Sequence, residues 1–233
     1  YVAENLPKLL ADRGFGEPGT ATAADSLEAA LDGAWLAVES VPEKLETKIA
    51  VWGQIDRTAP PDTIFGTNSS SLPSRLMAER VRDKTRLCNT HFYMPPGINA
   101  VELMSDGHTA RGVLDTLLTV LPEYGFRPFE VRRESTGFIF NRIWAAIKRE
   151  SLAVVAEGVA RPEDVDGMFK ENWRVAVGPF QMMDQVGLDV VLDIENHYTA
   201  EFPYLPTRAR DLLRAYVDAG KLGVKTGEGF YTY

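Results

Sequence analysis

The sequence has few of the residues that build disulfides and metal centres. Its 233 residues include one cysteine, Cys88, and three histidines. A single cysteine excludes a disulfide within the chain and fits a reducing compartment. The histidines are scattered, so the ligand spacing of a zinc site is absent and we expect no metal. Cys88 lies in the apolar stretch RLCNTHF, where we interpret it as a small buried hydrophobic residue.

Blocks of like charge and long apolar runs are absent as well. The net charge is −8 and the two signs are interspersed, which argues against nucleic acid or an anionic membrane surface as the main partner. No apolar run approaches the roughly 18–20 residues that cross a bilayer. The sequence begins without a signal-peptide pattern. These absences predict a cytoplasmic protein.

A glycine-rich nucleotide loop is also missing. A dinucleotide-binding sheet carries G-x-G-x-x-G directly after its first strand. GFGEPG (14–19) does not qualify, because no strand precedes it and Pro18 fits a phosphate turn poorly. The sequence opens at Tyr1 in the middle of a helix-like pattern, which suggests that earlier residues are not included.

The first part of the sequence, residues 1–133, alternates strand-like and helix-like runs. Apolar, β-prone runs lie at 34–41, 63–68, 86–93, 100–104 and 126–133. Apolar residues at helical spacing lie at 43–56 and 110–125, with a shorter helical patch around 75–82. This alternation predicts an α/β domain with a parallel sheet and crossover helices.

The second part, residues 134–233, has a different pattern. A long helix is predicted at 137–158 from apolar residues at spacings of three and four. Helix-like runs follow at 161–173, 187–202 and 209–220, and no convincing strand occurs before the aromatic tail. We therefore predict a second, all-helical domain.

Polar side chains follow three of the predicted strands. Glu43 follows the first, Asn68 and Ser69–Ser71 follow the second, and His91 lies near the end of the third. Ligands of parallel α/β sheets bind at the carboxyl ends of strands, so these groups are candidates for one site. Two structural interpretations remain open. The serine run could be a polar turn or helix cap, and Glu43 could be a first-turn helix carboxylate.

The segment YMPPGIN, between His91 and Glu102, is rich in turn formers. An antiparallel hairpin centred between Pro96 and Gly97 would place His91 opposite Glu102, with Cβ atoms roughly 4.5–5.5 Å apart. A carboxylate beside an imidazole fixes its tautomer and stabilises the imidazolium, as a general base requires. The alternative is a histidine that is simply satisfied within the core.

Six segments, in order along the chain, resemble the 3-hydroxyacyl-CoA dehydrogenase family. They are VESVPEKLETK (38–48), GTNSSSL (66–72), THFYMPP (90–96) with VELM (101–104), STGFIFNR (135–142), VGPFQMMDQVGLD (177–189) and LGVKTGEGFY (222–231). The third is similar to the family's H-F-F-N-P followed by V-E-V. The resemblance implies a partial Rossmann-like sheet, without its N-terminal strands, and a helical C-terminal domain. It also implies oxidation of L-3-hydroxyacyl-CoA to 3-oxoacyl-CoA with NAD.

The resemblance assigns roles to several residues. His91 would take the proton of the substrate's 3-hydroxyl while hydride passes to the nicotinamide, and Glu102 would stabilise the charge that His91 gains. Ser70 would hydrogen-bond the substrate's oxygen. Asn141, which lies inside an apolar helix and either faces solvent or is placed for a ligand, would contact the same region. The residues implied at the cofactor are Glu43, Lys48 and Asn68.

The sequence departs from the family pattern near the turn and at its start. Met94 replaces the asparagine of H-F-F-N-P, and it cannot donate a hydrogen bond to a thioester carbonyl. Either another group polarises the carbonyl, or the substrate differs, or turnover is slow. The spacing between His91 and Glu102 is one residue shorter than usual. The family's first strand, glycine loop and second strand have no counterpart, so we expect very weak NAD binding by this polypeptide alone.

Two alternatives to acyl-CoA oxidation follow from these departures. One is a dehydrogenase of a small 3-hydroxy acid that carries no CoA, and the other is a non-catalytic relative or fragment. The resemblance further implies a homodimer that forms through the apolar helical domain, which includes Ile143, Trp144 and Ile147.

Overall fold

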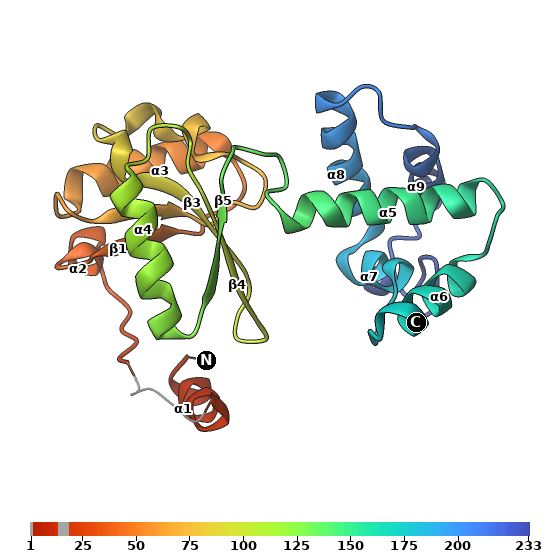
Figure 1. Cartoon of the computed structure of the whole chain (residues 1–233), viewed down its shortest axis with the longest axis horizontal. Helices are drawn as coiled ribbons and strands as arrows, with labels where there is room; N and C mark the ends of the chain where they lie inside the picture. The colour runs from red at the N-terminus through yellow and green to blue at the C-terminus, as the bar shows by residue number, and fades with distance from the viewer. Residues whose placement is uncertain (1, 14–18) are drawn as a thin grey trace. The chain divides into compact units, whose positions relative to one another are not determined.

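The computed structural model describes residues 2–13 and 19–233, so GFGEPG (14–19) lies outside the described residues except for its last glycine. The chain divides into two compact units, Tyr1–Ile139 and Phe140–Tyr233 (Figure 1). The sequence pattern changes a few residues earlier, at 134. The intervening segment belongs to the first unit because its backbone donates hydrogen bonds to the side chains of Met104 and Glu102.

The first unit is built around a mixed sheet. Its helices and strands are α1 (Val2–Arg13), α2 (Leu27–Leu31), β1 (Leu36–Glu39), α3 (Leu45–Thr58), β2 (Ile64–Thr67), β3 (Leu87–Met94), β4 (Ile98–Met104), α4 (Arg111–Val120) and β5 (Arg127–Val131). The helical patch expected at 75–82 consists of two short 3-10 turns, Ser74–Leu76 and Ala78–Arg80. The predicted α/β class is confirmed.

The strand order of the sheet is β1-β2-β3-β4-β5. Strands β1, β2 and β3 run parallel, β4 returns antiparallel to β3, and β5 runs parallel to β4. The direction reverses at β4 because the short turn at 95–97 leaves no room for a crossover helix. The carboxyl ends of β1, β2 and β3 therefore lie at one edge.

Helices α3 and α4 cover opposite faces of this sheet. Neighbouring residues of a strand point to opposite sides. Phe65 and Leu87 pack with Trp52 of α3, whereas Ile64 and Cys88, each the chain neighbour of one of them, pack in the cluster of α4. Figure 1 shows α4 running along one face. Cys88 is fully buried, which confirms the interpretation of a buried small residue.

The second unit is helical, as predicted. Its elements are α5 (Phe140–Ala156), α6 (Pro162–Trp173), α7 (Pro179–Val186), α8 (Leu188–Glu201), α9 (Arg208–Asp218) and the 3-10 turn Val224–Thr226. Its core joins side chains of α5, α7, α8 and α9 with Phe230 of the tail. The sequence pattern does not predict α7, a short helix that begins directly after Gly178.

Two buried aspartates fix α7 and the tail. Asp166 of α6 accepts hydrogen bonds from the backbone N–H groups of Phe180 and Gln181, at 2.8 and 3.0 Å. It thereby caps the start of α7, whose first N–H groups have no partner within the helix. Asp184 accepts from the N–H groups of Phe230 and Tyr231 at 3.0 and 2.9 Å and anchors the tail. None of the helices in the described part of the chain combines the length and apolarity that crossing a bilayer demands.

Candidate active site

The first unit lines up polar residues across its three parallel strands. Glu39, Thr67 and Asn89 are direct neighbours in the register of β1, β2 and β3. Residues that follow this row therefore emerge at the carboxyl edge of the sheet. These include Glu43 and the segment Asn68–Leu72, which we name the serine corner. His91 lies on β3 two residues beyond the row, so the predicted convergence of the three strand ends is confirmed.

His91 and Glu102 face each other on β3 and β4, as the sequence predicts. The imidazole Nδ1 lies 3.2 Å from the carboxylate Oε2, and the residues are 6% and 3% exposed. The assumption of a symmetric turn is wrong, however. Met94 pairs with Ile98, and an irregularity between that pair and Phe92 restores the expected register. An extra residue on β4 at this irregularity accounts for the shift.

Glu102 also accepts hydrogen bonds from Tyr93 and Ile139, which the sequence pattern does not predict. The hydroxyl of Tyr93 donates to Oε2 at 2.7 Å. The backbone N–H of Ile139 donates to the other oxygen, Oε1, at 2.8 Å. Tyr93 lies two residues after His91, so strand alternation would have placed both side chains on one face. No comparable sequence signal marks Ile139, because its contact depends on the path of the chain after β5.

The imidazole of His91 packs against two aromatic rings. The ring centroids of Tyr93 and Phe138 lie 4.5 and 5.1 Å from its own. Phe138 is buried and has a φ angle of 55°, in the left-handed region that a bulky residue rarely adopts. It follows Gly137, whose φ is 74°. This turn carries the Phe138 ring to His91 and the next N–H group, of Ile139, to Glu102.

The amide of Asn68 links the serine corner to β3. Its Oδ1 accepts a hydrogen bond from the backbone N–H of Phe92 at 2.8 Å. Asn68 therefore fixes the backbone next to His91, while its predicted contact with the cofactor stays a prediction. Ser70 is exposed at the corner, which leaves its hydroxyl accessible to a substrate.

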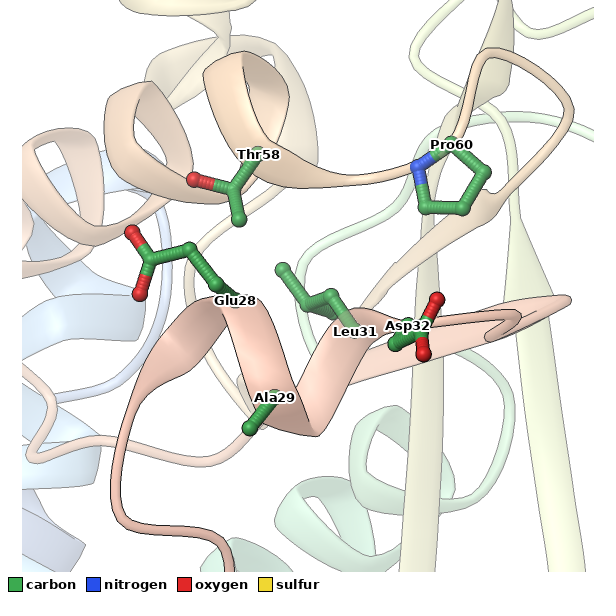
Figure 2. A pocket seen from close by; sticks show the side chains of 6 residues that line it. All are labelled: Glu28, Ala29, Leu31, Asp32, Thr58 and Pro60. Atoms are coloured by element: carbon green, nitrogen blue, oxygen red, sulfur yellow. The ribbon is translucent and has the colours of Figure 1, made fainter.

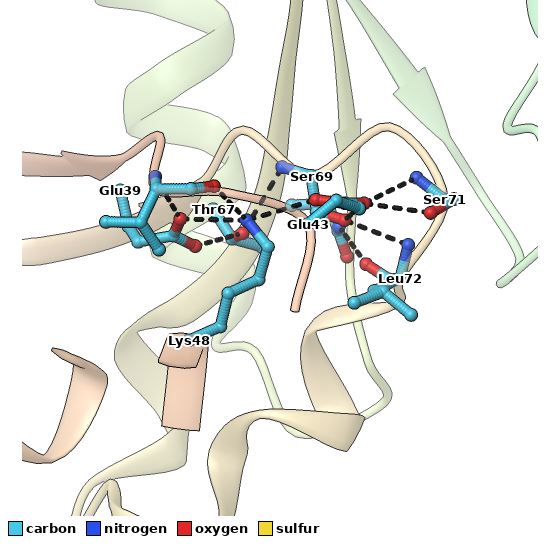
Figure 3. A network of polar contacts seen from close by, with 9 residues as sticks. Glu39, Glu43, Lys48, Thr67, Ser69, Ser71 and Leu72 are labelled. Carbon is cyan, nitrogen blue, oxygen red and sulfur yellow. Dashed lines mark hydrogen bonds and ion pairs between the residues drawn. The ribbon is translucent and has the colours of Figure 1, made fainter. Parts of the chain in front are cut away.

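Glu43 and Lys48 hold the serine corner in place through a network of hydrogen bonds and ion pairs, which Figure 3 shows. Lys48 of α3 is 1% exposed, and its Nζ lies 2.8 Å from Glu39 Oε1 and 3.1 Å from Glu43 Oε2. The hydroxyls of Ser69 and Ser71 both donate to Glu43 Oε1. The two serines that flank Ser70 are thus tied to one carboxylate.

The environment of Glu43 favours its ionised form. Partial burial raises the pKa of Glu43, but hydrogen bonds from Ser69 and Ser71 and the charge of Lys48 outweigh it, so its pKa is lowered overall. The interpretation of Glu43 as a first-turn helix residue is wrong, because α3 begins at Leu45. The serine run forms a polar turn and not a helix cap: the hydroxyl oxygen of Ser69 accepts from the N–H of Leu72 at 2.9 Å, and no helix begins there.

The remaining candidates lie in less constrained surroundings. Met94 is 74% exposed at the end of β3. Asn141 is half-buried in the first turn of α5, in the second unit. Its contact with the substrate region stays a prediction. The part of the chain that the structure describes contains no group of acidic, histidine or cysteine side chains able to hold a metal ion.

A hollow of about 400 Å³ lies elsewhere on the first unit, between α2 and the end of α3. Figure 2 shows its lining side chains, which include Glu28, Asp32 and Thr58. Helix α2 leads into the start of β1, and α3 leads into the start of β2. The hollow is therefore at the amino ends of the strands, opposite the edge that holds His91.

Comparison with known proteins accounts for both units. Residues 19–135 match the family model of the 3-hydroxyacyl-CoA dehydrogenase NAD binding domain. Residues 137–233 match that of the 3-hydroxyacyl-CoA dehydrogenase C-terminal domain. The chain belongs to the 3-hydroxyacyl-CoA dehydrogenase family. The first unit is therefore the Rossmann-like, NAD-binding domain of this family, and the second is its helical domain.

This member of the 3-hydroxyacyl-CoA dehydrogenase family is similar to relatives whose names refer to acyl-CoA substrates and to a relative whose name refers to a different substrate. It is 46% identical over 151 residues to the 3-hydroxyacyl-CoA dehydrogenase-like protein LAM1 of Cochliobolus heterostrophus, covering 64% of this chain and 32% of that protein. It is 30% identical over 219 residues to 5-formyl-3-hydroxy-2-methylpyridine 4-carboxylate 5-dehydrogenase of Mesorhizobium japonicum, covering 92% of this chain and 71% of that protein. The chain thus spans about a third of the first relative and most of the second.

Among solved structures, the chain is similar to (S)-3-hydroxybutyryl-CoA dehydrogenase PaaH1 from Ralstonia eutropha. The TM-score is 0.84 at 28% identity, and the match covers 100% of this chain and 84% of that one. The described residues of this 3-hydroxyacyl-CoA dehydrogenase family member therefore have a fold similar to that of a solved relative.

Proposed function

We propose that the protein oxidises L-3-hydroxyacyl-CoA to 3-oxoacyl-CoA with NAD, and that His91 is the base. The observation that carries this proposal is the buried pair of His91 and Glu102 at the edge of the sheet that also presents Ser70. Membership of the 3-hydroxyacyl-CoA dehydrogenase family supports the reaction class and the cofactor.

The pair supplies a base of defined tautomer. An ionised carboxylate only accepts hydrogen bonds, so His91 donates from Nδ1 to Glu102 and keeps the lone pair on Nε2. In the proposed reaction Nε2 takes the proton of the 3-hydroxyl. The C3–H bond breaks, its electron pair leaves as hydride, and the C3–O bond becomes a carbonyl. Glu102 then stabilises the imidazolium.

Ser70 and Asn141 complete the proposed substrate site. The exposed hydroxyl of Ser70 would donate to the substrate oxygen as negative charge builds on it during proton loss. Asn141 would approach the same oxygen from α5. Because both neighbours of Ser70 are tied to Glu43, the hydroxyl of Ser70 needs little reorganisation to bind.

Several residues fit the nicotinamide side of NAD. The carboxylate of Glu43 is ionised and its side chain is 40% exposed, so it can accept hydrogen bonds from ribose hydroxyls. Asn68 directly precedes Ser69, whose hydroxyl donates to Glu43. Lys48 is buried and would act through Glu43, which it holds in place. Bound NAD would supply the hydride acceptor.

A second candidate is the oxidation of a small 3-hydroxy acid that carries no CoA. Met94 cannot donate a hydrogen bond to a thioester carbonyl, and the relative from Mesorhizobium japonicum carries the name of a pyridine carboxylate dehydrogenase. The same pair of His91 and Glu102 would serve as base, because the bonds that change are the same.

A substrate panel tests the two candidates. NADH formation by the full-length protein would be followed with 3-hydroxybutyryl-CoA, longer 3-hydroxyacyl-CoA esters and free 3-hydroxybutyrate at matched concentrations. We expect kcat/KM to be highest for a CoA ester. A higher value for the free acid would favour the second candidate. Tight NAD binding by calorimetry without turnover of any substrate would favour a non-catalytic relative.

A further inference from the structure

Tyr93 and His91 share one carboxylate oxygen. The Tyr93 hydroxyl lies 2.7 Å from Glu102 Oε2, and the His91 Nδ1 lies 3.2 Å from the same atom. The two rings are also in contact, with centroids 4.5 Å apart. Tyr93 stands where the family pattern H-F-F-N-P has a phenylalanine, which could supply the ring contact but not the hydrogen bond.

The hydroxyl of Tyr93 points into the protein although the neighbouring segment is exposed to solvent. Tyr93 is half-buried, and the residues that follow it, from Met94 to Ile98, are exposed. A tyrosine at such a place can keep its hydroxyl in solvent. Here the hydroxyl instead reaches a carboxylate that is 3% exposed. A buried carboxylate is destabilised unless donors surround it, so the contact stabilises the ionised form of Glu102.

We propose that Tyr93 is a positioning residue for the proton transfer to His91, an inference that rests on the proposed function. With Ile139 on Oε1 and Tyr93 on Oε2, the carboxylate of Glu102 is fixed in rotation. Oε2 is thereby held where it receives Nδ1–H, and Nε2 remains free to take the substrate proton. Tyr93 contacts neither substrate nor cofactor in this arrangement.

The shared oxygen also affects where the proton rests. When His91 gains a proton, the imidazolium and the carboxylate compete for the hydrogen on Nδ1. Donation from Tyr93 spreads the negative charge of Oε2 and weakens its pull on that hydrogen. The proton therefore stays on the imidazole, ready to be released to solvent after the product leaves.

The substitution Tyr93→Phe removes the hydroxyl and keeps the ring. We expect kcat to fall about 5- to 20-fold, since one hydrogen bond to a charged group is lost, while KM for NAD and for the acyl-CoA stays within two-fold. In a Glu102→Gln background the same substitution should change kcat by less than two-fold, because the carboxylate through which Tyr93 acts is gone.

Tyr231→Phe is the matched control. It removes a hydroxyl that donates to a buried carboxylate, Asp166, at 2.8 Å in the second unit. We expect a lower melting temperature and an unchanged kcat for this variant. An unchanged kcat for Tyr93→Phe, or the same fold-change in the parent and in the Glu102→Gln background, would overturn the positioning role.

A spectroscopic readout separates this inference from the proposed function. The ¹⁵N resonances of the neutral His91 ring report which nitrogen carries the hydrogen, with or without turnover. We expect the Nδ1–H tautomer in both proteins, with the Nδ1 resonance displaced in Tyr93→Phe because Oε2 then pulls more strongly on that hydrogen. Identical ring spectra would overturn the role of Tyr93 even in an active enzyme. A parent that is inactive on every substrate but shows the expected ring spectra would contradict the proposed function alone.

Discussion

Hydrogen-bond donors converge on the carboxylate of Glu102, and this is the decisive feature at the scale of single residues. They include the imidazole of His91, the hydroxyl of Tyr93 and the backbone N–H of Ile139. Removing an ionised group from water is unfavourable unless hydrogen bonds replace the lost hydration. These donors therefore stabilise a buried, ionised partner for His91.

Ser70 and Ser69 should respond differently to loss of their hydroxyls. Ser70 is exposed, so Ser70→Ala should lower kcat about 10²-fold, as expected for one donor to a developing oxyanion, and leave the melting temperature unchanged. Ser69 is 1% exposed and contacts Glu43 and Leu72, so Ser69→Ala should lower the melting temperature. Steady-state kinetics and thermal unfolding of both variants give the comparison. A lower melting temperature with an unchanged kcat in Ser70→Ala would contradict the role of Ser70 as a donor to the substrate.

The residue-scale site could be predicted in part from the sequence. The pairing of His91 with Glu102 is predicted from a symmetric turn, and it occurs because an extra residue on β4 compensates for the different turn that the chain adopts. The donation from Ile139 could not be predicted, because it requires the left-handed conformation of Phe138. No local pattern predicts a strained bulky residue, since surrounding contacts impose it.

At the scale of elements, Glu43 connects three pieces of the fold. It lies just before α3, pairs with Lys48 from within α3 and accepts hydrogen bonds from the serine corner after β2. Glu39 and Thr67 extend the same network down to the strands. The serine corner is therefore held by side-chain hydrogen bonds in addition to the backbone hydrogen bond from the N–H of Asn68 to the carbonyl of Glu39.

This arrangement predicts a pH-dependent contribution of Glu43 to stability. Its pKa is lowered in the folded protein, so its stabilisation is fully present above the ordinary value of 4.5 and is lost as the pH falls through the lowered folded value. Glu43→Gln should lower the melting temperature at neutral pH, and the gap to the parent should close below pH 4.5. Thermal unfolding from pH 7 to pH 3 measures this difference in melting temperature, and Glu46→Gln, at an exposed position, is the control. A difference that widens in acid would contradict a stabilising role of the ionised Glu43 carboxylate.

The sequence predicted the longer elements and missed α7. Strands such as 86–93 and helices such as 137–158 carry periodic apolar residues that their burial imposes. Helix α7 has eight residues, too few for a clear periodic signal. Its start is stabilised by Asp166 from another helix, and that contact exists only after folding. Gly178 fits the same contact, because an added Cβ would come within 2.5 Å of Asp166.

At the scale of the whole molecule, the two units have separate cores. The homodimer stays a prediction, and the exposed apolar residues of α5 offer a way to test it. Ile143 is 54% exposed. If the dimer forms through this surface, Ile143→Lys should convert it to a monomer, because a charge would be buried at the interface. Light scattering on the full-length protein gives the mass. A dimer of undiminished stability would place the interface elsewhere.

Cys88 provides a probe of folding in the first unit. It is fully buried, and burial, together with the charge of Asp106, raises the pKa of its thiol to about 12. The thiolate is the reactive form, so we expect Cys88 to resist thiol reagents at pH 8 until the first unit unfolds. Labelling rates across a denaturant series should follow the unfolding transition of that unit. Rapid labelling of the native protein would contradict the packing of β3.

The most direct test of the proposed chemistry is the kcat of the full-length His91→Ala variant for 3-hydroxybutyryl-CoA, measured as NADH formation beside the parent. We predict a fall of about 10²- to 10⁴-fold, the usual contribution of a positioned general base, with NAD affinity retained because His91 makes no predicted contact with the cofactor. A kcat within a few-fold of the parent would contradict the assignment of His91 as the base.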